Sequence, residues 1–205
     1  MTNTDFTIPQ GRKVGQVLDG ARAVFVARGY ERASMDEIAR AANVSKATVY
    51  SYFADKRELF TAMYRAEMLR LADSVVELTD FDIPPERAMY VAGQKMLEYL
   101  TSDFALAMYR ICVAETPRFP EIGVAFYEGG PELGRARFGA YLREADARGL
   151  LRVEDIDLAA DQFFQLCQTT VCDRMICGVQ DTFGQAEIAR VLDGAVATFM
   201  ARYGV

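Results

Sequence analysis

The stretch that decides the fold is residues 34–60, which read SMDEIARAANVSKATVYSYFADKRELF. Glu37 lies three residues after Ser34, a capping-box pattern that is typical of a helix N-terminus. The helix that begins there is followed by a tight turn, and Ser45 then begins a second, very short helix predicted over residues 46–53. Two short helices joined by a three-residue turn indicate a helix-turn-helix unit.

The second helix of this unit has the composition of a helix that reads DNA. Val49 and Phe53 are one helical turn apart and can both be buried, which leaves the small and polar residues around them exposed. In a helix-turn-helix unit this helix lies in the major groove, with its N-terminal residues at the base edges. Ala47 and Thr48 are small enough to approach a base, and Lys46 can reach guanine or a phosphate. Tyrosine hydroxyls and the N–H groups at helix starts suit phosphates.

Helical periodicity extends in both directions from this unit, and no stretch alternates in the manner of a strand meander. Upstream, apolar residues at helical spacing predict a helix over residues 13–28 that Gly29 ends. Downstream, Asp55 and Glu58 begin a helix that is predicted to reach about residue 78. Further helices, three of them with a proline in the first turn and two of them separated by a Gly-Gly break, are predicted over residues 85–101, 103–115, 117–127, 131–148, 157–178 and 184–203. The chain is therefore predicted to be all-α.

Charge is unevenly distributed along the chain. Residues 12–57 hold nine basic and five acidic side chains, a net charge of +4 within a chain whose formal net charge is −6. The remainder therefore carries −10. A basic segment attached to an acidic remainder favours a head that binds a polyanion and a body that repels it.

Composition removes several classes of chemistry. The 205 residues include no histidine, so Ser-His-Asp and Cys-His triads, H-E-x-x-H zinc sites and Glu-x-x-His di-iron sites are all excluded. The cysteines form no C-x-x-C pair, and the last three are five residues apart, a spacing that fans them around a helix. We expect no metal and no cofactor. Buried free thiols are the favoured interpretation, ahead of a redox sensor or a metal site, for Cys112, Cys167, Cys172 and Cys177.

Neither a membrane span nor a secretory leader is expected. No run reaches about 18 uncharged apolar residues, the length of a spanning helix. The first ten residues are polar and lack the apolar core of a secretory signal. These observations predict a cytoplasmic protein in a reducing compartment.

The region around the helix-turn-helix unit resembles, without a gap, the DNA-binding domain of the TetR family of bacterial transcriptional regulators. The match covers about residues 12–60 and rests on Gly29-Tyr30, Ser34, Ile38-Ala39, Ala42, Val44-Ser45-Lys46, Thr48, Tyr50, Tyr52-Phe53, Lys56 and Leu59-Phe60. The resemblance implies an all-helical homodimer with a three-helix DNA-binding head over residues 10–57. It also implies a larger ligand-binding and dimerisation body over residues 58–205, with the helix of residues 55–78 connecting the two.

The resemblance also assigns roles within the head. Ser34 and the start of its helix would contact phosphate, and Tyr50, Tyr52 and Lys56 would clamp the DNA backbone. Ala47 stands where the family often has glycine, which puts close backbone approach there in doubt. The residues expected at the DNA are Ser34, Ser45, Lys46, Ala47, Thr48, Tyr50, Ser51, Tyr52 and Lys56.

The body resembles, more loosely, the AcrR- and AefR-like branch of the family. The similarity rests on residues 114–121, on Phe126-Tyr127 and on Gly130-Pro131. That branch is often associated with the control of efflux pumps. Aromatic and methionine side chains of the body are first of all core, and buried polar ones need a partner. The residues expected around a ligand are Met108, Arg110, Glu115, Phe119, Phe126, Phe163, Gln165 and Gln168.

The predicted helix of residues 157–178 is apolar nearly all round, which is typical of a helix buried on two sides. Its own core and a partner subunit would together bury it, so this helix and the helix of residues 131–148 are expected at the dimer interface. The residues expected there are Phe164, Val171 and Met175.

Together these features predict a ligand-responsive regulator of transcription rather than an enzyme. It would repress a neighbouring gene, such as one for an efflux pump, from a pseudo-palindromic double-stranded operator at the nucleoid. A small apolar or amphipathic effector would release it by binding better to a body whose heads are wrongly spaced for DNA. The alternatives are an α-helical enzyme, or an adaptor whose helix-turn-helix unit no longer meets DNA.

Overall fold

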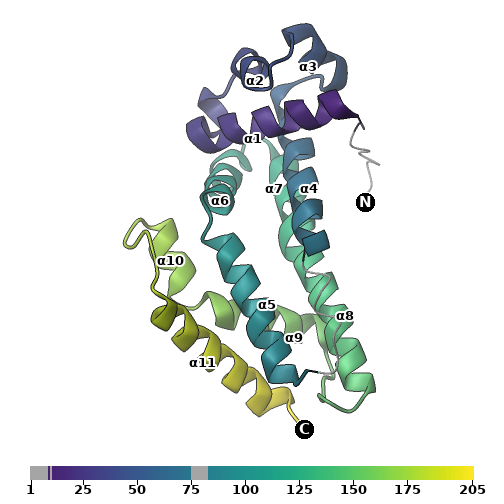
Figure 1. Ribbon diagram of the computed structural model, residues 1–205, viewed down its shortest axis with the longest axis vertical. Helices are drawn as coiled ribbons and strands as arrows, with labels where there is room; N and C mark the ends of the chain where they lie inside the picture. The colour runs from purple at the N-terminus through teal and green to yellow at the C-terminus, as the bar shows by residue number, and fades with distance from the viewer. Residues whose placement is uncertain (1–8, 10, 75–82) are drawn as a thin grey trace. The chain divides into compact units, whose positions relative to one another are not determined.

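The computed structural model describes residues 9, 11–74 and 83–205, and this part of the chain is almost entirely helical (Figure 1). Within these ranges the only strand-like pairing is an isolated bridge between Leu151 and Gly204, so the predicted all-α fold is confirmed. Residue 10 and residues 75–78 of the predicted connecting helix lie outside the described residues. The helices are α1 (Arg12–Arg32), α2 (Met35–Ala41), α3 (Lys46–Tyr52), α4 (Lys56–Ser74), α5 (Pro85–Leu100), α6 (Asp103–Glu115), α7 (Pro120–Tyr127), α8 (Leu133–Ala147), α9 (Ile156–Gln168), α10 (Val171–Ile176) and α11 (Gln185–Tyr203).

Contacts divide the chain into two compact units. Unit 1 comprises Met1–Arg70 and Ala107–Gly130, and unit 2 comprises Leu71–Leu106 and Pro131–Val205. Unit 1 therefore combines the three-helix head with most of α4, with the C-terminal half of α6 and with α7. The sequence prediction places these later elements in the body.

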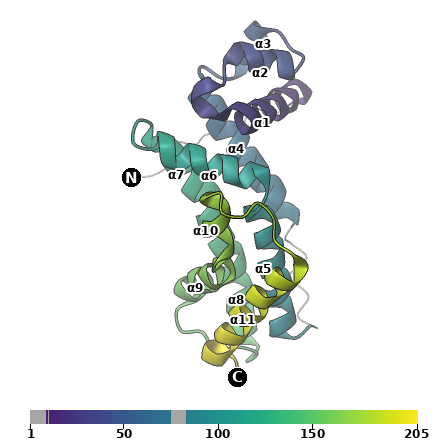
Figure 2. The same ribbon diagram turned by 90° about the vertical axis from the view of Figure 1, so that its left-hand side faces the viewer.

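The head is built by α1, α2 and α3, which lie together in both views of the molecule (Figure 2). Val49 and Phe53 of the α3 segment are fully buried, as predicted. A side chain at Gly20 would place its Cβ 2.8 Å from the backbone nitrogen of Ala42, so glycine allows α1 and α2 to pack closely. Burial of one apolar face of α3 leaves its other face outside the core.

Three predicted helix starts, at Ser34, Ser45 and Asp55, are confirmed by their caps. The side chains of Ser34, Ser45 and Asp55 accept hydrogen bonds from the backbone N–H three residues further on, at 3.2, 3.1 and 2.8 Å. Gly29 leaves helical geometry with φ 73°, and a short turn continues α1 to Arg32. Each cap satisfies a backbone N–H that has no partner within its own helix.

Two predicted helix starts were wrong because neither Pro117 nor Pro131 lies in the first turn of an α-helix. The helix predicted from residue 117 begins at Pro120, since the backbone N–H of Phe119 turns back to the carbonyl of Glu115 at 2.7 Å. Pro131 lies inside a π-helical turn, Glu128–Glu132, which runs from α7 into α8 where a break was predicted. A wide π-helical turn accommodates a proline that has no N–H to donate.

The helix predicted over residues 157–178 is interrupted. Thr170 adopts a left-handed conformation with φ 64°, and this separates α9 from α10. Asp161, Gln162 and Gln165 of α9 are exposed, so this helix has a polar face and is not apolar all round. Two consecutive β-branched threonines are weak helix formers, which is consistent with a break at this point.

The core of unit 2 is formed by α5, α8, α9 and α11, and α5 and α11 run side by side (Figure 1). Phe163 of α9 stacks on Phe138 of α8 and meets Phe199 of α11 edge to face, with ring centres 4.9 and 5.4 Å apart. Cys167 is fully buried beside them, and burial raises the pKa of its thiol to about 12. Phe163 is therefore a core residue, as predicted for the aromatic and methionine side chains of the body.

Candidate nucleic-acid interface

Helix α3 presents its polar residues to solvent. Its N-cap Ser45 and the following Lys46 and Ala47 are exposed, as are Tyr50 and Ser51, with Tyr50 at 45%. Thr48 and Tyr52 are half-buried. The buried side chains of Val49 and Phe53 attach this helix to the head, so the exposed residues stand on a rigid support.

The hydroxyl groups at the start of α3 are ordered by one another. The Oγ atoms of Ser45 and Thr48 lie 2.8 Å apart, and the Ser51 hydroxyl donates to the Thr48 carbonyl at 2.7 Å. Because these bonds fix side-chain rotamers, little entropy remains to be lost when the surface meets a ligand. Ser34 caps α2 and is exposed, so its hydroxyl and the first N–H groups of α2 are accessible.

Lys46 is held by a residue that the sequence reasoning missed. Its ammonium lies 2.6 Å from the Asp36 carboxylate and 5.9 Å from the centre of the Tyr50 ring. The hydrogen bond to Asp36 and the charge of that carboxylate raise the pKa of Lys46. Asp36 is ten residues away on another helix, and no spacing pattern in the sequence pairs the two. A phosphate or a base must therefore compete with Asp36 for this ammonium.

Lys56, which is predicted to contact phosphate, points its ammonium at the end of α1 in the structure. Its ammonium donates to the carbonyl oxygens of Tyr30, Ala33 and Glu31 at 2.7, 3.0 and 3.3 Å. An ammonium group has three protons, and these three acceptors match all of them. Lys56 therefore fastens the start of α4 to the end of α1.

Unit 1 also connects the head to the corner between α6 and α7. Arg57 pairs with Glu121 at 2.5 Å, and Arg118 pairs with Glu31 at 2.9 Å. The ring of Phe119 lies 5.9 Å from that of Tyr30. Burial first, and then the charge of Asp55, raises the pKa of Tyr30 to about 12. We call these three contacts the latch; none of them was predicted, because each joins residues more than sixty positions apart.

The eight residues expected around a ligand are divided between the two units. Met108, Arg110, Glu115, Phe119 and Phe126 belong to unit 1, and Phe163, Gln165 and Gln168 belong to unit 2. Met108 and Phe163 are fully buried, and Glu115 is the buried charged residue of the described chain, at 7% exposure. Phe119 is part of the latch, Phe126 stacks on Tyr64, and the Gln168 amide donates to the Phe164 carbonyl.

The residues expected at a dimer interface mostly face inward in the single chain. Val171 is fully buried and Met175 is 7% exposed, and Phe164 is half-buried with its ring 5.3 Å from that of Phe138. On α9 the exposed apolar side chain is Leu158, at 51%. Phe164, Val171 and Met175 were predicted to share one exposed face because residues 157–178 were expected to form one continuous helix, which the structure divides into α9 and α10.

Among the described residues, no cluster of three or more acidic, cysteine or histidine side chains is placed to hold a metal ion. No helix within the described ranges is both long and apolar enough to cross a bilayer.

Comparison with known proteins finds two family models that match successive parts of the chain. Residues 17–63 match the family model of the tetR family of bacterial regulatory proteins, and residues 87–205 match that of the AefR-like transcriptional repressor C-terminal domain. The chain is 32% identical over 96 residues to the HTH-type transcriptional activator FasR of Mycolicibacterium smegmatis, which covers 47% of this chain and 44% of FasR. This chain spans less than half the length of the curated relatives that it matches first.

Two solved structures match over nearly the whole chain. One is described as a TetR-family transcriptional regulator from Mesorhizobium loti MAFF303099, with a TM-score of 0.88 and 28% identity over 96% of this chain and 100% of that one. The other is the flavonoid-responsive regulator FrrA, with a TM-score of 0.77 and 29% identity over 95% of this chain and 98% of that one. The chain belongs to the TetR family of bacterial transcriptional regulators, with a C-terminal domain of the AefR-like type.

Proposed function

We propose that this protein is a ligand-responsive repressor that binds a pseudo-palindromic operator as a homodimer. The observation that carries the proposal is the polar face of α3, which is exposed, ordered by its own hydrogen bonds and fixed to the head through Val49 and Phe53. Lys46, Ala47 and Thr48 stand at the start of α3, where a recognition helix meets base edges. Ser34, Tyr50 and Tyr52 can donate hydroxyl protons to phosphates on either side.

Repression is favoured over activation because the matching C-terminal domain is described as that of a repressor. The relative FasR is named as an activator, which makes activation the alternative. We assign the effector to the class of small apolar or amphipathic molecules. FrrA, which shares the fold at 29% identity, is named for its response to flavonoids, which supports this class. A neighbouring gene, such as one for an efflux pump, is the proposed target.

For the homodimer we propose that the exposed faces of α9 and α11 meet a second copy. The two helices pack on each other, and the Tyr203 hydroxyl of α11 donates to the Gln162 amide oxygen of α9 at 2.6 Å. Leu158 is exposed on α9, and α11 exposes small side chains that permit close helix approach. These small residues are Gly194, Ala197, Thr198 and Ala201.

The proposal is tested by selecting duplexes from a random DNA pool with the purified protein and measuring affinity for the enriched sequence by fluorescence anisotropy. We expect a pseudo-palindrome with half-sites about one helical turn, or a small multiple of it, apart. Ala47→Asp places a carboxylate at the proposed DNA surface and should weaken binding at least tenfold. Ala186→Asp is the matched control, because Ala186 is exposed in the first turn of α11 and should tolerate an acidic residue. Equal affinities for the two variants, or no enriched sequence, would overturn the proposal.

A further inference from the structure

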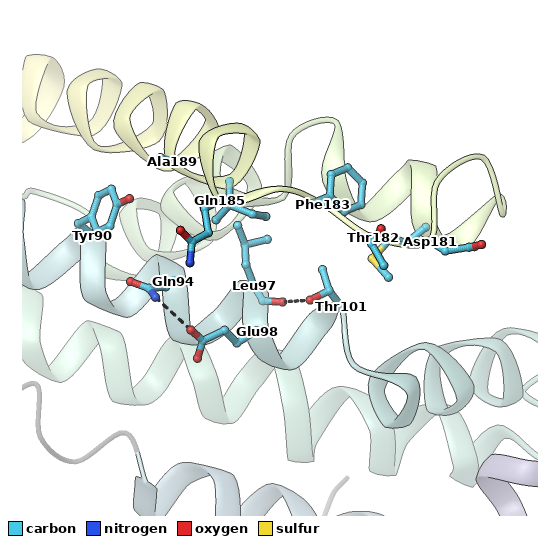
Figure 3. A pocket seen from close by; sticks show the side chains of 12 residues that line it. Tyr90, Gln94, Leu97, Glu98, Thr101, Asp181, Thr182, Phe183, Gln185 and Ala189 are labelled. Carbon is cyan, nitrogen blue, oxygen red and sulfur yellow. Dashed lines mark hydrogen bonds between the residues drawn. The ribbon is translucent and has the colours of Figure 1, made fainter.

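A hollow of about 630 Å³ lies within unit 2 between α5 and the segment that leads from α10 into α11 (Figure 3). One face of α5 lines it from Tyr90 to Thr101 at helical spacing. Asp181, Phe183 and the first turns of α11 line the opposite side. None of these residues was expected at a ligand site from the sequence.

The floor of the hollow is apolar and its rim is polar. Leu97 and Met175 are buried at its base, and Phe183 and Ile188 are partly buried beside them. Around the rim, the Gln94 amide donates to the Glu98 carboxylate at 3.1 Å, as Figure 3 shows. A molecule that filled this hollow would therefore contact both hydrocarbon and hydrogen-bonding groups.

The charge of the lining has one sign. Glu98 and Asp181 are carboxylates, and no lysine or arginine of the described chain lines the hollow. The described partner of the Glu98 carboxylate is the neutral Gln94 amide. Both carboxylates are exposed, and Figure 3 shows them at opposite ends of the hollow. An anion would therefore meet no opposite charge in the lining, whereas a cation would meet one carboxylate at either end.

We propose that this hollow is the effector site and that it takes an amphipathic cation, with the apolar body on Leu97 and Met175 and the charge toward one of the two carboxylates, Glu98 or Asp181. The role of the hollow as an effector site rests on the proposed function, whereas the binding of a cation to it does not. Thr101 lines the hollow, and the chain continues two residues later into α6, whose C-terminal half belongs to unit 1. The chain itself therefore connects the end of α5 to the unit that contains the head.

The test uses tetraphenylphosphonium and tetraphenylborate, which have nearly the same size and shape and opposite charge. Their binding to the purified full chain is measured by isothermal titration calorimetry without DNA. We expect the cation to bind at least tenfold more tightly than the anion. The double variant Glu98→Gln, Asp181→Asn should remove this preference. The control Glu154→Gln, which changes an exposed carboxylate outside the lining, should keep it.

A second variant tests the location independently of charge. Ala189 lines the hollow from α11, and Ala189→Trp should fill it and abolish binding of the cation, with circular dichroism verifying the fold. Equal binding of the two ions, or unchanged cation binding in Ala189→Trp, would overturn the site. Operator affinity, measured with and without the cation, separates the two proposals. Charge-selective binding without any operator binding would reject the proposed function alone. Operator binding that the bound cation leaves unchanged would reject the effector role of this hollow.

Discussion

The ammonium of Lys56 lies 2.7 Å from the carbonyl oxygen of Tyr30 and 4.5 Å from the centre of the Tyr30 ring. One side chain thus binds the end of α1 twice, through hydrogen bonds to its carbonyls and through the face of its last aromatic residue. Tyr30 in turn contacts Phe60 of α4 and Phe119 of the latch. Lys56 therefore belongs to the framework of the head, where it fastens α4 to α1.

The first prediction is that Lys56→Ala destabilises the protein and does not change its electrostatic contact with DNA. Loss of a charged donor to three carbonyl oxygens should lower the free energy of unfolding by about 2 kcal/mol, measured by urea denaturation. The slope of log affinity against log salt for operator binding should stay unchanged, because no phosphate contact is lost. Lys13→Ala, at an exposed position in the first turn of α1, should leave stability unchanged. A salt slope reduced by about one per subunit in Lys56→Ala would instead assign Lys56 to a phosphate.

The second prediction is that Asp36→Asn strengthens operator binding. Asp36 holds the Lys46 ammonium at 2.6 Å and places a negative charge beside the proposed DNA surface. Its removal frees Lys46 and should tighten binding about two- to tenfold, measured by fluorescence anisotropy. Asp19→Asn makes the same charge change in the same unit, at a carboxylate paired with Arg70. An equal gain from both variants would mean that only net charge matters.

The third prediction separates the dimer interface from the core. Leu158 is half exposed on α9, so Leu158→Asp should yield folded monomers in analytical ultracentrifugation and lose most of the operator affinity. Val171 is fully buried within unit 2, so Val171→Asp should unfold that unit because it buries a charge without a partner. A folded dimer of Leu158→Asp would place the interface elsewhere.

The fourth prediction concerns alkaline pH. Burial raises the pKa of Cys167 from 9.0 to about 12 and that of Cys172 from 9.0 to about 11. Between pH 9 and the pKa of each thiol in the folded protein, the thiol releases its proton in the unfolded chain and keeps it in the folded one. The free energy of unfolding therefore falls as pH rises above 9. Each fully shifted thiol contributes up to about 1.4 kcal/mol per pH unit. Urea denaturation at pH 8, 9 and 10 should therefore show a smaller loss in Cys167→Ala than in the control Cys177→Ala, whose thiol is exposed. An equal loss of unfolding free energy with pH in the two variants would show that the Cys167 thiol does not cause it.

The local pattern was sufficient to predict the head. The caps at Ser34, Ser45 and Asp55 and the buried pair Val49 and Phe53 depend on neighbours within four residues, and all of them are present in the structure. Such interactions are determined by residue spacing along the chain, which is visible in a sequence. The same holds for the all-α fold and for the family resemblance of residues 12–60.

The body was predicted less well where the choice depended on packing. Pro117 and Pro120 are equally suited to a first turn, and the backbone bond from Phe119 to Glu115 decided between them. The left-handed Thr170 divides α9 from α10, and apolar periodicity alone could not reveal it. These outcomes depend on the backbone geometry, and the local sequence pattern is compatible with more than one geometry.

The sequence by itself therefore determined the all-helical fold, the caps at Ser34, Ser45 and Asp55 and the charge of residues 12–57, and it predicted the polar face of α3 as a DNA-reading surface. Tertiary structure alone decided that Lys56 binds carbonyls, that Asp36 holds Lys46, that Val171 is core, and that Glu98 and Asp181 line one hollow. The physical reason is the range of the interactions. Helix formation and capping act between near neighbours, whereas the partner of a charge and the burial of a side chain are set by residues that only the folded chain brings together.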